Sequence, residues 1–399
     1  MLYLACLKAG AVFTPLNTAY TAAEVDYFIG DAEPKLVVRD AVALADEAQS
    51  LAPVAQCVPR EDGDLASLIY TSGTTGRSKG AMLSHGNLAA NALALHEAWG
   101  FTGDDVLLHA LPIFHVHGLF VAMHCAFLSG IPMVWLAKFS EAEVVAGLKR
   151  ATVMMGVPTF YTRLLDSPLF TKESAAGVRL FVCGSAPLLV STFEAFRERT
   201  GQPILERYGM SEAVIITTNP LKGERLAGSV GYPLPGVDLR IAGGETGVIQ
   251  IKGPSVFSAY WRMPEKTAEE FTADGYFITG DVGRQDADGR VWISGRAKDL
   301  IISGGFNVYP KEIELILDEM PGVIESAVIG LPHPDFGEGV AAVVMGQGDE
   351  AAMIAKARES LAAFKAPKRI FFVDDLPRNA MGKVQKNLLR DAYKDAFQA

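Results

Sequence analysis

The sequence is poor in features that define several classes of protein. It has only four cysteines among 399 residues, and none of them has the Cys-x-x-Cys spacing of a zinc or redox site: Cys6, Cys57, Cys125 and Cys183. Neither a disulfide framework nor a zinc centre is predicted, and scattered cysteines are typical of a reducing cytoplasm. No window reaches the roughly 18 consecutive apolar residues that a membrane-spanning helix requires. We therefore expect a cytoplasmic protein with no membrane span.

Positive charge is also scarce. Lysine and arginine number 36 against 46 acidic residues, which gives a formal net charge of −10, and no basic cluster is present. A nucleic-acid partner is therefore not predicted, because such partners need a basic surface. The hydrophobic content of 49% and charged content of 21% are typical of a globular enzyme with sizeable cores. We expect small-molecule substrates and a monomer or homodimer.

The pattern of apolar runs predicts an α/β fold. Apolar runs such as Lys35–Val38 and Leu65–Tyr70 read as strands and alternate with helical segments, as in parallel β-α-β units. From about residue 226 short strands separated by glycine and proline predict a β-rich subdomain. We therefore predict a large N-terminal domain, residues 1–296, of mixed and parallel sheets with helices plus a β-rich subdomain at about 226–296. A small, mobile α+β C-terminal domain would follow at 297–399.

The most informative segment is a loop directly after the predicted strand Leu65–Tyr70. Residues 71–80 read Thr-Ser-Gly-Thr-Thr-Gly-Arg-Ser-Lys-Gly. Glycines let backbone N–H groups turn inward, hydroxyls donate further hydrogen bonds and the lysine adds charge, so the loop is typical of a polyphosphate site. It is not a Walker loop, because Ser78 stands where that pattern, counted from Gly73, needs glycine. The alternative, a polar surface turn, rarely gathers so many hydroxyls and glycines.

Further motifs follow this loop. Residues 207–212, Arg-Tyr-Gly-Met-Ser-Glu, offer an aromatic face, a glycine, a hydroxyl and a carboxylate, which could stack a purine and ligate Mg²⁺. Thr-Gly-Asp at 279–281 and Gly-Arg at 295–296 each place a charge beside a glycine. Two adjacent glycines at 304 and 305 lie shortly before a predicted helix. Residues 376–383 form a predicted loop that contains a glycine and ends in a lysine. Taken singly, the motifs at 279–281 and 295–296 are equally compatible with a solvated turn, and for the other motifs an ordinary turn or a solvated lysine is the favoured interpretation.

Taken together, the motifs resemble those of the adenylate-forming superfamily of acyl- and aryl-CoA synthetases, peptide-synthetase adenylation domains and firefly luciferase. Five of them, Tyr-Thr-Ser-Gly-Thr-Thr-Gly-Arg-Ser-Lys-Gly, Tyr-Gly-Met-Ser-Glu, Thr-Gly-Asp, Gly-Arg-Ala-Lys-Asp and Pro-Arg-Asn-Ala-Met-Gly-Lys, occur in the family's order between residues 70 and 383. The resemblance implies that a carboxylate is activated as an acyl-adenylate and transferred to CoA, with ATP, Mg²⁺ and CoA as cofactors. It also implies that residues 1–296 form the AMP-binding domain, truncated at its start relative to the family.

The resemblance assigns roles residue by residue. Lys383, Glu212 and Ser211 would be catalytic, with Ser211 in the place of the usual threonine, and Glu212 and Thr71 would ligate Mg²⁺. The residues that would hold ATP belong to the phosphate loop, the adenine slot and the ribose contacts: Thr71, Ser72, Gly73, Thr74, Thr75, Gly76, Lys79, Gly184, Ser185, Ala186, Pro187, Tyr208, Gly209, Asp281 and Arg296. CoA would pass Gly304 and Gly305, and the small domain would turn about the hinge at Lys298 or Asp299.

Among the subfamilies, the resemblance is strongest to malonyl-CoA synthetases, which act on malonate or methylmalonate. It rests on residues 156–163, 184–188 and 305–314. In that subfamily an arginine and a serine hold the far carboxylate of the diacid, and here these are Arg163 and Ser185. Arginine suits that task because its guanidinium binds a carboxylate with two parallel hydrogen bonds. His115 would line the acyl pocket.

Several alternatives stay open. Arg163 would instead be a surface helix residue if it paired with Asp166 or Glu173. The substrate would be a short-chain fatty or aryl acid, or the acceptor a carrier-protein thiol, if the subfamily resemblance misleads. The chain would be an inactive nucleotide-binding remnant if the shortened start prevents turnover. Zinc binding by His115 and His117 is disfavoured, because no third ligand is in view.

Overall fold

The computed structural model describes residues 1–71, 78–378 and 383–397, and they divide into two compact units. The first unit comprises Met1–Leu239 and Ile251–Ile278, and the second comprises Arg240–Gln250 and Thr279–Ala399. The α/β fold class is confirmed. The domain boundary after residue 296 stays a prediction.

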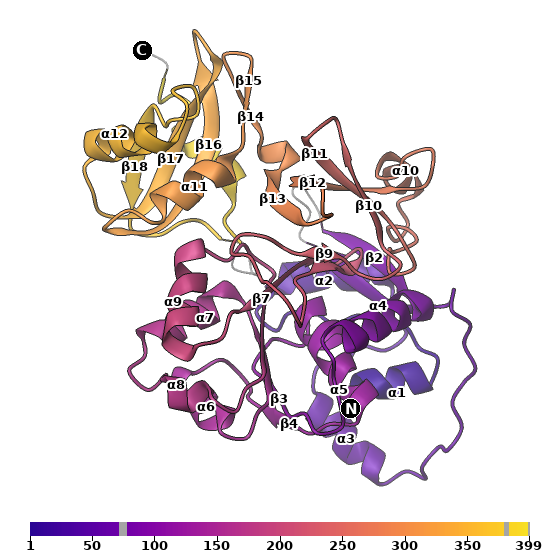
Figure 1. Cartoon of the computed structure of the whole chain (residues 1–399). Coiled ribbons are helices and arrows are strands. Elements are labelled where there is room, and N and C mark those ends of the chain that lie inside the picture. Colours follow the sequence, from indigo (N-terminus) through magenta and orange to yellow (C-terminus); the bar gives the residue numbers. More distant parts are fainter. Residues whose placement is uncertain (72–77, 379–382, 398–399) are drawn as a thin grey trace. The chain divides into compact units, whose positions relative to one another are not determined.

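A seven-stranded sheet forms the centre of the first unit, with the order β4-β3-β5-β6-β7-β8-β9. Strands β4, β3, β5, β6 and β7 run parallel, whereas β8 and β9 pair antiparallel. Of this sheet, β3, β4, β7 and β9 are labelled in Figure 1. The parallel part confirms the predicted β-α-β units. The strands are β3 (Leu107–His109), β4 (Met133–Trp135), β5 (Val153–Gly156), β6 (Leu180–Cys183), β7 (Leu205–Met210), β8 (Val214–Thr218) and β9 (Tyr232–Pro233).

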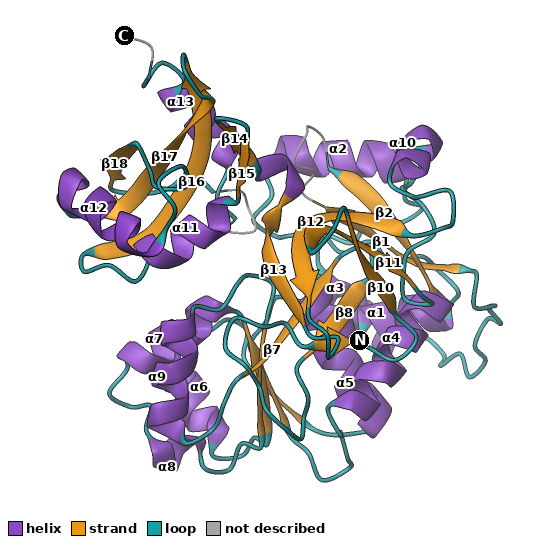
Figure 2. Cartoon of the chain, turned by 45° about the horizontal axis from the view of Figure 1, so that its top comes forward, coloured by secondary structure: helices purple, strands orange, loops and turns teal. Residues whose placement is uncertain are grey.

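Helices cover both faces of this sheet. Helices α6 to α9 lie on one face, and α4, the π-helix η1 and α5 lie on the other (Figure 2). The first face buries a cluster of large side chains that includes Tyr161, Phe181 and Phe196. Because both faces are covered, the central strands read as continuous apolar runs. The helices are α4 (His85–Ala98), η1 (His117–Ala122), α5 (Met123–Ser129), α6 (Glu141–Leu148), α7 (Pro158–Asp166), α8 (Lys172–Ala175) and α9 (Val190–Thr200).

The start of the chain contributes three helices and a hairpin: α1 (Leu2–Lys8), α2 (Ala22–Ala32), α3 (Ala41–Gln49), β1 (Leu65–Thr71) and β2 (Lys79–Ser84). The predicted strand at Leu65–Tyr70 is confirmed as β1. The predicted strand at Lys35–Val38 is wrong: Leu36 and Val37 are 68% and 43% exposed, and no strand of the described residues pairs with them. An apolar run becomes a strand only where a neighbour satisfies its backbone hydrogen bonds.

Two further sheets follow. The predicted β-rich region forms a four-stranded sheet of β10 (Asp238–Ala242), β11 (Thr246–Lys252), β12 (Phe277–Gln285) and β13 (Val291–Arg296), with helix α10 (Pro264–Glu269). The second unit ends in a sheet of order β15-β14-β17-β16, with β18 parallel to β17. Its elements are η2 (Ala297–Asp299), β14 (Ile301–Ser303), β15 (Phe306–Val308), α11 (Pro310–Leu317), β16 (Val323–His333), β17 (Gly337–Gly346), α12 (Glu350–Ser360), β18 (Arg369–Val373) and α13 (Lys386–Tyr393).

Alternate residues of β16 and β17 supply the two cores of this last sheet. Val328 and Val344 pack with α11 and α12, whereas Ile329 and Val343 pack with α13. This alternation follows from the two-residue period of a strand, which sends neighbouring side chains to opposite faces.

An ion pair between the buried carboxylate of Asp105 and the solvent-accessible Arg179 joins three segments of the first unit. Asp105, only 3% exposed, accepts hydrogen bonds from Arg179 Nε and Nη2, both at 2.7 Å, and from Thr152 Oγ1 at 2.6 Å. Arg179 also donates to the backbone oxygens of Trp99 and Gly100. Burial alone would raise the pKa of Asp105, but these hydrogen bonds and the guanidinium charge lower it to about 2. The carboxylate is therefore held in its charged form.

Replacing Asp105 with alanine is expected to lower the free energy of unfolding at pH 7 by about 2–3 kcal/mol, because Arg179 and Thr152 lose the carboxylate to which they donate hydrogen bonds. Since the folded-state pKa lies below the unfolded value, this stabilisation is present above about pH 4 and is lost as the pH falls toward 2. Urea titrations at several pH values check both points. Glu194→Ala removes an exposed pair with Arg197 and serves as the control, with a change below about 1 kcal/mol. Equal losses in both variants would contradict the expectation.

Candidate active site

The two ends of the predicted phosphate loop lie side by side. Thr71 ends β1, Lys79 begins β2, and the two residues are partners in the antiparallel hairpin. Ser72, Gly73, Thr74, Thr75 and Gly76 were predicted to bind phosphate and lie outside the described residues. The Lys79 ammonium is 3.3 Å from Glu270 Oε1 and 4.0 Å from the centroid of the Tyr260 ring.

The 207–212 motif lies at the end of β7 and in the turn to β8. Tyr208 and Gly209 belong to β7, and Ser211 and Glu212 follow it. Gly209 has to be glycine, because a Cβ there would lie 1.9 Å from the backbone oxygen of Val214. Glu212 is 6% exposed, and its Oε1 accepts a hydrogen bond of 3.0 Å from the Tyr260 hydroxyl.

These residues fit a magnesium site of the kind that substrate phosphates complete. No cluster of three or more histidine, cysteine or acidic residues with metal-binding geometry occurs in the described parts of the chain. Magnesium bound beside phosphates is usually held by only one or two carboxylates, however, with phosphate oxygens and water as its other ligands. Glu212 could provide such a carboxylate, and Tyr260 links it to Lys79. The magnesium roles of Glu212 and Thr71 stay predictions.

The predicted adenine slot follows β6. Gly184, Ser185, Ala186 and Pro187 leave the carboxyl end of this parallel strand, where ligands of α/β sheets commonly bind. Ser185 has a φ angle of 72°, an unusual backbone conformation for serine that is often found at functional sites. Its hydroxyl is 3.1 Å from Nδ1 of His117.

Arg207, for which no role was predicted, lies beside this slot. A Cβ on Gly184 would be 2.5 Å from Arg207 Cζ, so the glycine makes room for the guanidinium. Arg207 is 4% exposed, and neither its Nε nor its Nη2 has a hydrogen-bond partner within the described residues. Burial lowers its pKa to about 10, so it is a cation at pH 7. Arg207 could have been predicted from the sequence as a charged residue within a buried strand, because a buried charge needs a partner.

His117 completes this group. It is 2% exposed, and its Nε2 likewise has no hydrogen-bond partner among the residues that the structure describes. Burial, followed by the charge of Arg207, holds its pKa well below the usual value, so the imidazole is neutral. Arg207, His117 and Ser185, which we call the Arg207 cluster, therefore combine a buried cation with two neutral hydrogen-bonding groups.

The other predicted substrate residues lie in α7 and before η1. The Arg163 side chain is 52% exposed, donates from Nε to Glu141 Oε1 at 2.6 Å and lies 4.8 Å from the centre of the Phe139 ring. Its acidic partner is thus Glu141 and neither Asp166 nor Glu173. His115 is half-buried, and its Nδ1 accepts a hydrogen bond from the backbone N–H of His117 at 3.3 Å. The substrate-binding roles of Arg163 and His115 stay predictions.

In the second unit, the structure brings the two predicted ribose ligands together. Asp281 on β12 and Arg296 on β13 are partners in the antiparallel sheet, with Arg296 Nε 2.9 Å from Asp281 Oδ1. Gly304 and Gly305 form the turn between β14 and β15, with φ angles of 59° and 83°. A two-residue hairpin with both φ values positive requires such residues, so the turn itself explains the glycines. Their predicted contact with CoA is untested.

The predicted hinge and lysine also belong to this unit. Lys298 and Asp299 lie in η2, where Asp299 Oδ1 accepts a hydrogen bond of 2.8 Å from Arg390 Nη2. Burial is the main cause that lowers the pKa of Lys298. Lys383 is exposed, and its charge contributes to that lowering. The hinge and the catalytic role of Lys383 stay predictions.

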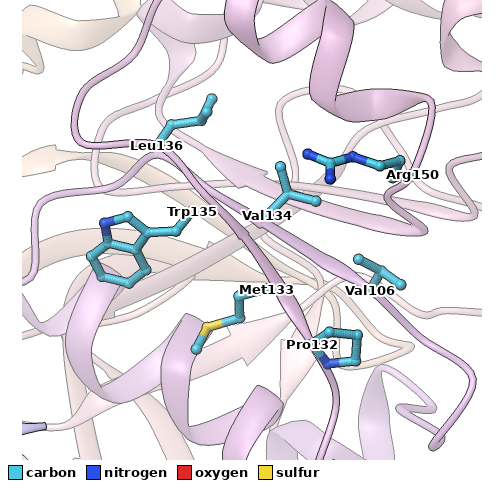
Figure 3. Close-up of a pocket in the computed structure, with 7 residues that line it drawn as sticks. All are labelled: Val106, Pro132, Met133, Val134, Trp135, Leu136 and Arg150. Atoms are coloured by element: carbon cyan, nitrogen blue, oxygen red, sulfur yellow. The ribbon is translucent and has the colours of Figure 1, made fainter.

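A pocket of about 370 Å³ lies elsewhere, at the β4 edge of the seven-stranded sheet (Figure 3). None of the predicted site residues that the structure describes lines this pocket. Its lining residues are Val106, Pro132, Met133, Val134, Trp135, Leu136 and Arg150. The pocket therefore does not change the assignment of the site to the carboxyl ends of β6 and β7.

Comparison with protein families decides the classification. The family described as "AMP-binding enzyme" matches residues 1–261, and the "AMP-binding enzyme C-terminal domain" matches residues 312–383. The chain belongs to the AMP-binding enzyme family. No helix in residues 1–71, 78–378 and 383–397 has the length and apolar character needed to cross a membrane. The cytoplasmic location and the oligomeric state stay predictions.

Similar family members include malonate ligases. Malonate–CoA ligase of Arabidopsis thaliana is 39% identical over 375 residues, which is 83% of this chain. The chain spans 61% of the length of that relative. ATP-bound MatB from Rhodopseudomonas palustris superposes with a TM-score of 0.95 at 53% identity, covering 100% of this chain and 86% of MatB. A malonyl-CoA ligase complex with methylmalonyl-CoA and AMP has a TM-score of 0.68 at 39% identity, covering 94% of this chain and 87% of that one.

Proposed function

We propose that this AMP-binding enzyme is an AMP-forming acyl-CoA ligase that activates malonate or methylmalonate. One carboxylate oxygen of the diacid attacks the α-phosphorus of ATP and expels pyrophosphate. The thiol sulfur of CoA then attacks the acyl carbon, releases AMP and loses its proton, which gives malonyl-CoA or methylmalonyl-CoA. The family membership and the similarity to malonate ligases support the reaction class.

The Arg207 cluster is the observation that carries the diacid proposal. A buried guanidinium with unused donors is costly unless a ligand supplies an anion. A monocarboxylate offers only one carboxylate, which is consumed at phosphorus, whereas a diacid has a second. We propose that this second carboxylate receives hydrogen bonds from the Nε and Nη2 of Arg207. Ser185 and neutral His117 would fix its orientation without adding charge.

The remaining candidate residues would bind the other parts of the substrates. Arg163 fits the proposal as a second cation, because its ion pair with Glu141 is solvent-exposed, and exposed pairs are weak and easily broken. Lys79 would bind phosphate oxygens, Asp281 and Arg296 the ribose, and Lys383 the charge that builds at the α-phosphate. Glu212 would hold Mg²⁺, which supplies neutralisation of phosphate charge when bound. CoA would pass Gly304 and Gly305.

Pyrophosphate release with ATP and Mg²⁺ tests the proposal. The panel is malonate, methylmalonate, acetate, butyrate and benzoate, each with and without CoA, and mass spectrometry identifies the thioester. We expect turnover to prefer malonate or methylmalonate and to need CoA for repeated cycles. A preference for acetate, butyrate or benzoate would overturn the diacid assignment. ATP binding without pyrophosphate release from any acid would instead indicate a nucleotide-binding remnant.

A further inference from the structure

Tyr260 touches both charged groups that the proposed function assigns to the polyphosphate. Its hydroxyl donates to Glu212 Oε1 at 3.0 Å, and the ammonium of Lys79 lies 4.0 Å from its ring centroid. Tyr260 follows β11 in the sequence, far from residues 71–80 and 207–212, and belongs to none of the motifs that identified the site.

The Tyr260 ring is held from several sides. It is 3% exposed and packs edge-on against Phe257 at 4.7 Å between centroids. Its backbone N–H donates to Thr267 Oγ1 at 3.0 Å, and an isolated β-bridge joins it to Ala81 of β2. A ring so fixed sets the positions of the groups that it contacts, because neither its backbone nor its side chain is free to follow them.

Lys79 and Glu212 carry opposite charges and lie on the same aromatic residue, yet Lys79 is paired with Glu270 at 3.3 Å and not with Glu212. A direct pair between them would consume both charges before a nucleotide arrived. The ring prevents this, since its negative face attracts the ammonium while its hydroxyl, at the edge, occupies an oxygen of the carboxylate. The contact with Glu270 is shared with Lys266 at 3.1 Å, so it does not bind Lys79 exclusively.

We infer that Tyr260 is a positioning residue that separates Lys79 from Glu212 and aims both at one magnesium–polyphosphate group. The inference rests on the proposed function. The two parts of Tyr260 have different tasks. The hydroxyl positions the carboxylate of Glu212, which would hold Mg²⁺, and the ring positions the ammonium of Lys79, which would bind phosphate oxygens. The two tasks can be separated by substitution, because phenylalanine removes only the hydroxyl whereas leucine removes the hydroxyl and the aromatic face.

Calorimetric titration of the full chain with ATP, without a carboxylic acid, tests the inference in excess Mg²⁺ and in excess EDTA. For Tyr260→Phe we expect about tenfold weaker binding in Mg²⁺ and a change below about twofold in EDTA, since hydrogen bonds to a metal-holding group typically alter metal affinity by about 10–100-fold. Tyr260→Leu should weaken binding in both conditions. Tyr276→Phe, which removes an exposed hydroxyl bonded to Asp238, is the matched control and should match the wild type.

The outcomes separate the inference from the function on which it rests. Wild-type protein that binds no ATP in either condition would count against the proposed function, and the inference would fall with it. Wild-type binding with no loss in Tyr260→Phe, or with equal loss in Mg²⁺ and EDTA, would overturn the inference and leave the proposed function standing. A magnesium-specific loss in Tyr260→Phe at an unchanged melting temperature supports it, because a purely structural role would not depend on the metal.

Discussion

Replacing Arg207 with methionine is expected to lower kcat/KM for malonate by about 10²–10³-fold while the protein stays folded. The loss corresponds to about 3–4 kcal/mol, as expected when a paired charge-assisted contact to the far carboxylate disappears inside a site shielded from water. Arg207 is 4% exposed, and its Nε and Nη2 have no hydrogen-bond partner among the residues that the structure describes, so little intramolecular bonding is lost.

The same substitution is expected to leave the melting temperature unchanged or to raise it by about 2–4 °C. Burial lowers the pKa of Arg207 to about 10, which shows that the folded protein already disfavours its charge. Exchanging a buried charge for an apolar side chain of similar length is often neutral or stabilising by roughly 1–4 kcal/mol. Loss of activity together with retained or increased stability is the signature of a binding residue, because a structural residue would lower both.

Two comparisons make this result specific. Arg197→Met on α9 removes an exposed arginine and should leave both activity and stability near the wild-type values. Arg207→Lys keeps the charge but not the planar fork, so it should recover only part of the malonate activity. The decisive quantity is the ratio of malonate to acetate turnover, which should fall in Arg207→Met. An equal fall for both acids would contradict the carboxylate role and place Arg207 in a step common to all substrates.

The candidate site residues that the sequence predicted belong to motifs that are local in the chain. The strand predicted before residues 71–80 is confirmed as β1, and Thr71 and Lys79 from the predicted phosphate loop are partners in the β1–β2 hairpin. Asp281 and Arg296, predicted from separate glycine-containing motifs, face each other across β12 and β13. Such residues are found from sequence because glycine, hydroxyl and charge occur together within a few positions, where a turn needs them.

The Arg207 cluster could not be predicted in the same way. Arg207 and Gly184 are separated by α9 in the chain and become neighbours only because β6 and β7 pair in parallel. His117 comes from η1, which lies on the face of the sheet opposite to α9, and its Nδ1 lies within hydrogen-bond distance of the Ser185 hydroxyl. Sequence spacing carries no information about which side chain a parallel neighbour presents, since register is set by the packing of the whole sheet.

Tyr260 and the segment Lys35–Val38 both show that local sequence does not determine tertiary partners. The contact of Tyr260 was not predicted, whereas the strand at Lys35–Val38 was predicted but does not form. Tyr260 reads as an ordinary core aromatic, and only the folded chain places its hydroxyl on Glu212. Lys35–Val38 reads as a strand from its composition, yet it has no neighbouring strand among the described residues. In both cases the tertiary partner decides the outcome, because burial and pairing override local preference.

Replacing Glu212 with glutamine is expected to lower pyrophosphate release with malonate by about 10²–10³-fold, the loss typical of removing one electrostatic contributor. Glutamine has the shape of glutamate, and its amide oxygen can still accept the Tyr260 hydroxyl, so the fold should be unaffected. What disappears is the negative charge that we propose holds Mg²⁺. Glu265→Gln on α10 removes an exposed carboxylate and should behave as the wild type.

The magnesium dependence of Glu212→Gln separates a metal role from other causes of lost activity. If Glu212 holds Mg²⁺, the concentration of Mg²⁺ that gives half-maximal pyrophosphate release should rise by about 10–100-fold, and excess Mg²⁺ should restore part of the rate. A lower rate with an unchanged magnesium dependence would instead show that the carboxylate acts on the nucleotide or the protein. Because Tyr260→Phe leaves the charge of Glu212 in place, its dependence on Mg²⁺ should shift in the same direction but by less. The order wild type, Tyr260→Phe, Glu212→Gln is therefore the ranking expected if orientation and charge contribute separately to one metal site.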